Sequence, residues 1–157
     1  MNDFTNIGQT MHEYLNKGAF LVAGKDKPNV MTVSWGMIGV MWRKKIVVVP
    51  VRESRYTKEF LDKEGEFTLS VPFEKMSKEI AFCGTKSGRE VDKFEALGLK
   101  KVKGEKVDTY KVGGCDAYFE CRVLAKIPLT ADMLPDEVKE IAYQDSDYHT
   151  LYIGEVL

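Results

Sequence analysis

Hydrophobic positions along the chain gather in six short runs that are rich in β-branched and aromatic residues and are bounded by Gly, Pro, Asn or Asp. Such runs are typical of β-strands, because branched and aromatic side chains pack well on a pleated surface. In the longest run, apolar and more polar residues alternate, which favours an antiparallel sheet with one wet face. The expected strands cover residues 18–24, 29–36, 45–51, 66–72, 117–127 and 150–157.

Helical periodicity is less frequent. Tyr56, Phe60 and Leu61 recur at helical spacing, and we expect the helix that they define to begin near Ser54. The other expected helices cover residues 10–18, 75–83, 90–98 and 135–144. Because strands outnumber helices and do not alternate with them regularly, the pattern favours a mainly β protein, a β-barrel with peripheral helices.

Composition narrows the class of protein. The chain has 157 residues and no internal repeat or low-complexity linker, which predicts a single domain over residues 1–157. With 44% hydrophobic residues, 30% charged residues and a net charge of -1, it resembles an ordinary globular protein with no general attraction for nucleic acid. The lysine-rich stretch 98–107 has no interleaved aromatic residues to stack on bases, so we interpret it as a solvated strand edge.

Membrane and metal partners are not expected. No apolar run approaches the ~20 residues that a membrane span requires, and the N-terminus lacks the basic and then apolar pattern of a secretory signal. We therefore expect a cytoplasmic protein. Cys83, Cys115 and Cys121 form no C-x-x-C pair and are odd in number, which predicts reduced thiols without a disulfide framework or a metal site.

A polar turn stands where one apolar run ends and a helical pattern begins. The stretch "VRESRYTKEF" at 51–60 places Arg52, Ser54, Arg55 and Thr57 at the positive end of the expected helix, with Ser54 as its cap. Arginine offers planar donors that match phosphate oxygens, and hydroxyls complete the shell without adding charge. The turn therefore predicts a phosphate site; the alternative is a capped surface helix with solvated arginines.

Two further stretches carry candidate binding groups. In "CGTKSGREVDKF" at 83–94, Gly84 and Gly88 permit close approach of the backbone to a ligand, although neither a Walker A motif nor a dinucleotide fingerprint is present. In "NVMTVSWG" at 29–36, small polar groups and Trp35 could surround a planar heteroaromatic ring. The alternatives are an exposed loop between helices and an edge strand with a core tryptophan.

These stretches together carry a family resemblance. The succession "NVMTVSWG", "VVVPVRESRYTKEF", "GEFTLSVP", "CGTKSGREVDKF" and "DYHTLYIGEV" resembles the flavin reductase-like proteins of the FMN-binding split-barrel superfamily, particularly the flavoredoxin-like group. The resemblance extends from about residue 18 to residue 157. It implies a six-stranded Greek-key split barrel, a homodimer with FMN bound near the subunit interface, and flavin-dependent reduction by NADH or NADPH.

The same resemblance implies roles for individual residues. Those expected to face the isoalloxazine ring and ribityl chain are Asn29, Thr32, Ser34 and Trp35. Those expected to hold the ribityl chain and phosphate are Arg52, Ser54, Tyr56, Thr57, Ser87 and Lys93. His149 matches the late histidine of the family and is expected to approach the flavin, whereas His12 is interpreted as a surface residue of the N-terminal helix.

Three functions follow from these patterns. The first is an FMN-dependent oxidoreductase, in which the flavin carries the redox chemistry and the protein supplies binding and orientation. The second is a non-catalytic electron carrier or flavin store, which would need the same contacts. The third is a structural or interaction protein whose polar turns are solvated loops. No dinucleotide fingerprint is present from which a choice between NADH and NADPH could be argued.

Overall fold

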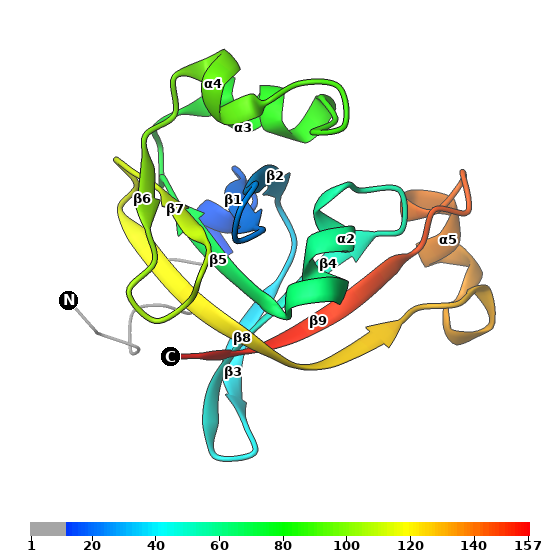
Figure 1. Cartoon of the computed structure of the whole chain (residues 1–157). Helices are drawn as coiled ribbons and strands as arrows, with labels where there is room; N and C mark the ends of the chain where they lie inside the picture. The colour runs from blue at the N-terminus through cyan, green and yellow to red at the C-terminus, as the bar shows by residue number, and fades with distance from the viewer. Residues whose placement is uncertain (1–11) are drawn as a thin grey trace.

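The computed structural model describes residues 12–157 and is built around a large antiparallel sheet (Figure 1). Within these residues the sheet has seven strands in the spatial order β2-β1-β5-β8-β9-β4-β3. They are β1 (Ala19–Ala23), β2 (Asn29–Val33), β3 (Met37–Met41), β4 (Lys44–Arg52), β5 (Glu66–Val71), β8 (Ala117–Pro128) and β9 (His149–Val156). The mainly β fold and all six expected strands are confirmed. The structure adds β3 to them.

The sheet curls without closing. Strand β2 contacts β4, but the two share no ladder of hydrogen bonds and lie apart in the strand order. The fold is therefore a split barrel, as expected, with seven strands in its main sheet where the resemblance implied six. A separate two-stranded ribbon pairs β6 (Lys101–Lys103) with β7 (Tyr110–Val112). Its exposed lysines lie within the stretch that we expected to form a solvated strand edge.

The core occupies both faces of β1, which explains the uninterrupted apolar run in that strand. Leu21 faces the inside of the barrel together with Phe67 of β5 and Tyr152 of β9. Phe20, on the opposite face, packs with Phe94 under the helices α3 (Ser77–Thr85) and α4 (Lys93–Leu97). Burial of each such side chain contributes about 1.5–3 kcal/mol, so both clusters hold the sheet in its curled form.

The helices lie outside the barrel (Figure 1). They are α2 (Thr57–Glu64), α3 (Ser77–Thr85), α4 (Lys93–Leu97) and α5 (Asp136–Ala142), with a short 3-10 turn at Ala131–Met133. Residues 12–15 are also helical, and the rest of the expected N-terminal helix before residue 12 lies outside the described part. The expectation that α2 begins near Ser54 is wrong, because its first residue is Thr57. No helix within residues 12–157 is long and apolar enough to cross a membrane.

The β3–β4 hairpin projects from the body of the barrel (Figure 1). Its turn is made by Trp42 and Arg43, which have φ angles of 53° and 58°. Tight hairpin turns with positive φ usually carry Asn-Gly or Asp-Gly, so this turn lacks the expected sequence signal and β3 was not predicted. The hairpin and the residues before it expose five large apolar side chains, the apolar hairpin edge: Trp35, Met37, Val40, Met41 and Trp42.

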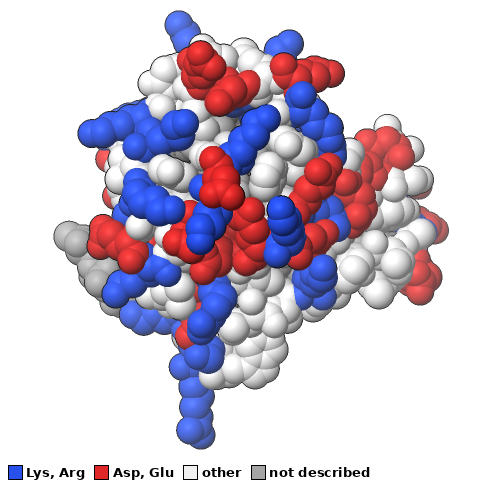
Figure 2. All heavy atoms as spheres, in the orientation of Figure 1, with Lys and Arg blue, Asp and Glu red and all other residues white. Residues whose placement is uncertain are grey.

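Charges of both signs are interspersed over the face of the molecule seen in Figure 2. Basic and acidic side chains alternate across the barrel on this face, and neither sign forms a continuous field. The low net charge of the sequence is therefore matched here by a mixed surface.

Candidate functional site

The split between β2 and β4 contains a cavity of about 210 Å³. Strand β2 and the residues that follow it form one wall, β4 forms the other, and β9 contributes a histidine. The lining residues are Met31, Thr32, Val33, Ser34, Trp35, Pro50, Arg52, Arg55 and His149. The structure thus brings together the predicted residues Thr32, Ser34, Trp35, Arg52 and His149 in one place, the first cavity.

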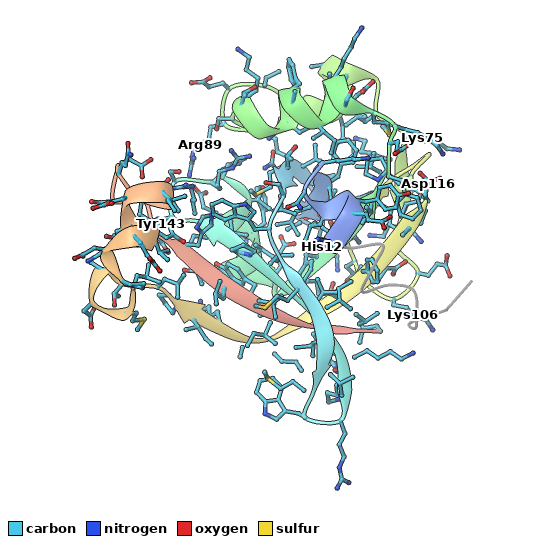
Figure 3. All side chains as sticks on the ribbon, turned by 180° about the vertical axis from the view of Figure 1, so that it is seen from behind. His12, Lys75, Arg89, Lys106, Asp116 and Tyr143 are labelled. Carbon is cyan, nitrogen blue, oxygen red and sulfur yellow. The ribbon has the colours of Figure 1, made fainter. Side chains whose placement is uncertain are left out.

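His149 is the buried polar residue of this cavity. It lies opposite Arg52 in the β4–β9 ladder, and its ring centroid is 5.3 Å from that of Trp35. Its Nδ1 is 2.7 Å from the hydroxyl of Tyr143, which follows α5 and is labelled in Figure 3. Burial, with the nearby positive charge of Arg52, lowers the pKa of His149 to about 4. The imidazole is therefore neutral at pH 7.

Arg52 holds the chain that follows α5. Its guanidinium donates to the carbonyl oxygens of Asp147 at 2.7 Å and Ala142 at 2.8 Å, and it lies 3.4 Å from the Asp145 carboxylate. The same group stands over the ring of Tyr143, 5.4 Å from its centroid. Arg52 lines the first cavity and is not among the residues that line the second, so its role in holding a phosphate stays a prediction.

A second cavity of about 180 Å³ adjoins the first. It lies between the start of α2, the end of α3 and the loop after α3. Its lining residues are Asn29, Met31, Ser54, Arg55, Tyr56, Thr57, Thr85, Lys86, Ser87, Gly88 and Lys93. Met31 and Arg55 line both cavities, so the two form one elongated groove. The predicted residues Asn29, Ser54, Tyr56, Thr57, Ser87 and Lys93 meet in its second part.

Two cations distinguish the second cavity, the buried Lys93 and the half-buried Arg55. Arg55 donates to the carbonyl oxygens of Gly84 at 2.8 Å and Cys83 at 3.1 Å, at the carboxyl end of α3. Lys93 Nζ donates to Cys83 at 3.2 Å and to Lys86 at 3.1 Å, and its side chain is only 3% exposed.

Neither cation is held in an ion pair in the described chain, although the charge of Asp147 acts on Arg55. Within residues 12–157, neither Arg55 nor Lys93 forms an ion pair with a carboxylate. Burial lowers the pKa of Lys93 to about 8 and lowers that of Arg55 as well. Uncompensated buried positive charge is costly, and a bound anion would offset that cost. Arg55 belongs to the turn that predicts a phosphate site, but it is not among the residues to which the resemblance assigns the phosphate.

Polar contacts around the groove fix its walls. Asn29 Nδ2 donates to Thr57 Oγ1 at 2.8 Å, which joins β2 to the first residue of α2. Thr32 Oγ1 donates to the carbonyl of Ile80 at 2.5 Å, so this hydroxyl supports α3. A Cβ on Gly88 would lie 1.9 Å from Asn29 Oδ1, and only glycine allows the loop to approach this closely.

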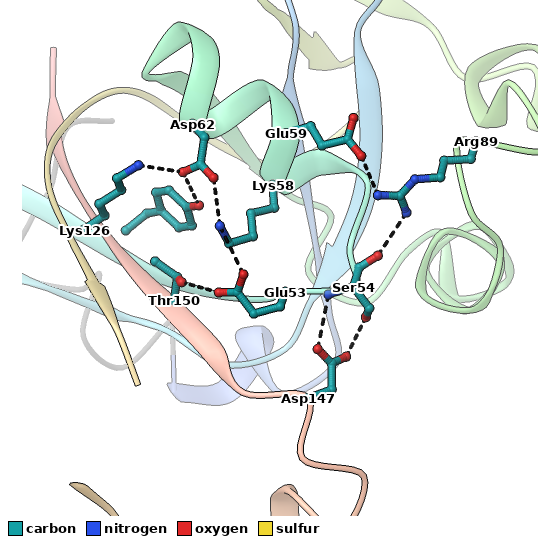
Figure 4. Close-up of polar contacts among 10 residues, drawn as sticks. Glu53, Ser54, Lys58, Glu59, Asp62, Arg89, Lys126, Asp147 and Thr150 are labelled. Carbon is teal, nitrogen blue, oxygen red and sulfur yellow. Dashed lines mark hydrogen bonds and ion pairs between the residues drawn. The ribbon is translucent and has the colours of Figure 1, made fainter. Parts of the chain in front are cut away.

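Ser54 does not cap α2, contrary to expectation. Its backbone N–H donates to Asp147 Oδ1 at 3.1 Å, and its hydroxyl donates to Asp147 Oδ2 at 2.5 Å (Figure 4). The N-cap residue of α2 is Tyr56, which makes no side-chain capping bond. Asp147 belongs to a segment that is remote in sequence, so no local pattern could show this contact.

The groove and the fold together define a class of protein. An antiparallel split barrel carries an elongated groove whose first part is lined by aromatic, apolar and polar side chains and whose second part contains the buried Lys93. Residues 11–157 match the model of the family described as flavin reductase like domain. The chain therefore belongs to the flavin reductase-like family.

Individual relatives agree with this assignment. An uncharacterised protein of Archaeoglobus fulgidus is 34% identical over 149 residues, which are 94% of this chain and 74% of that protein. The crystal structure of flavoredoxin from Methanosarcina acetivorans is similar with a TM-score of 0.71 and 25% identity, over 89% of this chain and 65% of that one. The structure of flavoredoxin of Desulfovibrio vulgaris (Miyazaki F) is similar with a TM-score of 0.71 and 26% identity, over 89% of this chain and 66% of that one. The chain thus spans slightly less than two thirds of either flavoredoxin.

Proposed function

We propose that this protein binds FMN in the groove and is a flavin reductase or electron-transfer oxidoreductase supplied by NADH or NADPH. The observation that carries the proposal is a pair of cations that line the second cavity, the buried Lys93 and the half-buried Arg55. Neither forms an ion pair with a carboxylate in the described chain. A phosphate there would supply the missing negative charge. Membership of the flavin reductase-like family and the likeness to flavoredoxins support the same ligand.

The residues of the groove divide the binding of such a ligand between them. In the first cavity, Trp35 and Pro50 would contact the ring system. In the second cavity, Lys93 has three N–H donors, and the described chain takes two of them. The third donor remains for a phosphate oxygen. When bound, the flavin would accept a hydride from the reduced nicotinamide and pass the electrons to an acceptor.

FMN is proposed in preference to FAD. Arg89, from the loop after α3, donates to the carbonyl of Ser54 at 3.0 Å and pairs with Glu59 of α2 at 2.5 Å. These contacts tie the loop to α2, the two elements that border the second cavity. A ligand that ends at its phosphate fits this arrangement, whereas an adenylate extension would have to pass these contacts.

The test is a titration of FMN, riboflavin and FAD into ligand-free wild type and Lys93→Met. Loss of a charge-assisted bond worth roughly 1.5–3 kcal/mol should weaken FMN binding about tenfold to a hundredfold. Riboflavin lacks the phosphate, so its affinity should be the same for both proteins. The variant should melt no lower than wild type without ligand, because an uncompensated buried charge has been removed.

Lys78→Met is the matched control, since Lys78 is an exposed lysine of α3 outside the groove. It should leave the affinity for FMN unchanged. Equal losses of affinity for FMN and riboflavin in Lys93→Met would contradict the binding of a phosphate at Lys93. An FMN complex that dithionite reduces but neither nicotinamide reduces would favour the electron carrier over the reductase.

A further inference from the structure

The contact between Tyr143 and His149 is more specific than ring packing. The two polar atoms are 2.7 Å apart, and both side chains are buried, at 7% exposure each. Tyr143 comes from the segment after α5, which reaches back beside β9 (Figure 3). Within the described chain no other side chain forms a hydrogen bond with either ring, so each ring depends on the other for its side-chain partner.

The position of the shared hydrogen follows from the chemistry of the two groups. Burial raises the pKa of Tyr143, so the phenol keeps its proton at neutral pH. A buried hydroxyl needs an acceptor, and in the described chain Nδ1 of His149 is the acceptor within reach. If the phenol donates to Nδ1, the single hydrogen of the neutral imidazole must lie on Nε2.

The surroundings of Tyr143 keep it in place. Arg52 binds the carbonyl oxygens of Ala142 and Asp147, which bracket the segment that carries Tyr143, and stands over the tyrosine ring. The ring of Tyr148 stacks on the ring of Tyr143, with centroids 4.8 Å apart and an angle of 27° between the ring planes. The phenol therefore approaches His149 from a fixed direction.

We infer that Tyr143 is a positioning residue that holds His149 as the Nε2–H tautomer and so presents a hydrogen-bond donor to the first cavity. Because Nδ1 is occupied, Nε2 is the nitrogen left for a ligand in that cavity, which His149 lines. The inference rests on the proposed function in one respect: the acceptor that this donor meets is an edge of the flavin ring. A donor there stabilises negative charge that develops on the ring during reduction.

The direct test is the histidine tautomer in ligand-free protein at pH 7, read from ¹⁵N–¹H correlation spectra of the imidazole nitrogens. With His12→Gln to assign the two histidines, wild-type His149 should show a single Nε2–H tautomer. Tyr143→Phe removes only the hydroxyl and should shift His149 to a mixture of tautomers. Tyr148→Phe is the matched control, because no hydrogen bond involves its hydroxyl in the described chain, and it should keep the wild-type spectrum.

A second measurement links the tautomer to the ligand. The midpoint potential of bound FMN should fall in Tyr143→Phe and stay unchanged in Tyr148→Phe. An Nδ1–H tautomer in wild type, or an unchanged tautomer in Tyr143→Phe, would overturn the inference; the wild-type spectrum decides even if the variant fails to fold. Failure of wild type to bind FMN would instead contradict the proposed function and leave the tautomer result standing.

Discussion

At the scale of single residues, burial sets the charge of the groove. His149 and Lys93 are both buried, and burial lowers the pKa of the first to about 4 and of the second to about 8. At pH 7 the histidine is consequently neutral, whereas most of the lysine stays charged at a cost to stability. An anionic ligand would offset that cost, so binding and stability place opposite demands on Lys93.

The histidine makes stability depend on pH. The pKa of His149 is about 4 in the folded protein and 6.5 in its ordinary state, so the unfolded chain takes up the proton first. The free energy of unfolding is therefore fully retained above pH 6.5 and falls as the pH drops towards 4. Between pH 7.5 and pH 5 we expect a loss of about 2 kcal/mol, measured by urea unfolding of ligand-free protein.

His149→Gln should remove most of this pH-dependent loss. His12→Gln provides the control, because His12 is exposed and is the other histidine of the chain. It should keep the wild-type dependence. If His149→Gln lost as much stability as wild type over the same interval, another group would have to take up the proton.

At the scale of elements, α2 is held against the sheet by one carboxylate. Asp62 accepts hydrogen bonds from Lys58 at 2.7 Å, from Lys126 of β8 at 3.0 Å and from the buried hydroxyl of Tyr152 of β9 at 2.8 Å (Figure 4). Burial works to raise the pKa of Asp62, but these bonds outweigh it and lower the pKa to about 2. Since Thr57 begins the same helix, this anchor also positions the wall of the second cavity.

Asp62→Ala should cost about 1–3 kcal/mol in the free energy of unfolding, because it leaves the buried Tyr152 hydroxyl without its acceptor. In a Tyr152→Phe background the same change should cost less, since no hydroxyl is left unpaired. Glu59→Ala, on the same helix with an exposed ion pair to Arg89, should cost less than about 1 kcal/mol. Equal costs for Asp62→Ala in both backgrounds, measured by urea unfolding, would show that Tyr152 does not depend on Asp62.

The elements were largely predictable, and the exceptions have physical causes. Apolar runs predicted six strands correctly, because burial of β1 on both faces leaves a continuous apolar signal. Strand β3 was not predicted, because its turn is formed by Trp42 and Arg43 with positive φ angles, a conformation that favours glycine. The groove was predicted as a set of residues. The contacts of Arg52 with Ala142 and Asp147 could not be predicted, because those residues are remote from it in sequence.

At the scale of the whole molecule, the apolar hairpin edge is a strip of large apolar side chains that the fold leaves exposed. Strand β3 pairs with β4 alone, and Val40 at its outer face is 73% exposed. Trp35 lines the first cavity and also an adjoining depression of about 400 Å³ with Met37 and Ile38. An apolar strip along an unpaired strand is typical of a protein interface, and one that borders the groove would cover part of the ligand.

We therefore expect a homodimer that is formed through the apolar hairpin edge, and sedimentation at micromolar concentration should find the wild type as a dimer. Val40→Lys should give a monomer, because a lysine buried at the interface would lack a partner. Without the second subunit over the groove, the variant should also retain less FMN. Ile141→Lys is the matched control: Ile141 is 85% exposed on α5, away from the hairpin, and its replacement should leave the dimer intact. Thermal melts of both variants show whether the fold is preserved. A wild-type monomer that retains stoichiometric FMN, or a Val40→Lys variant that still dimerises, would mean that the edge serves another contact and that a single chain completes the groove.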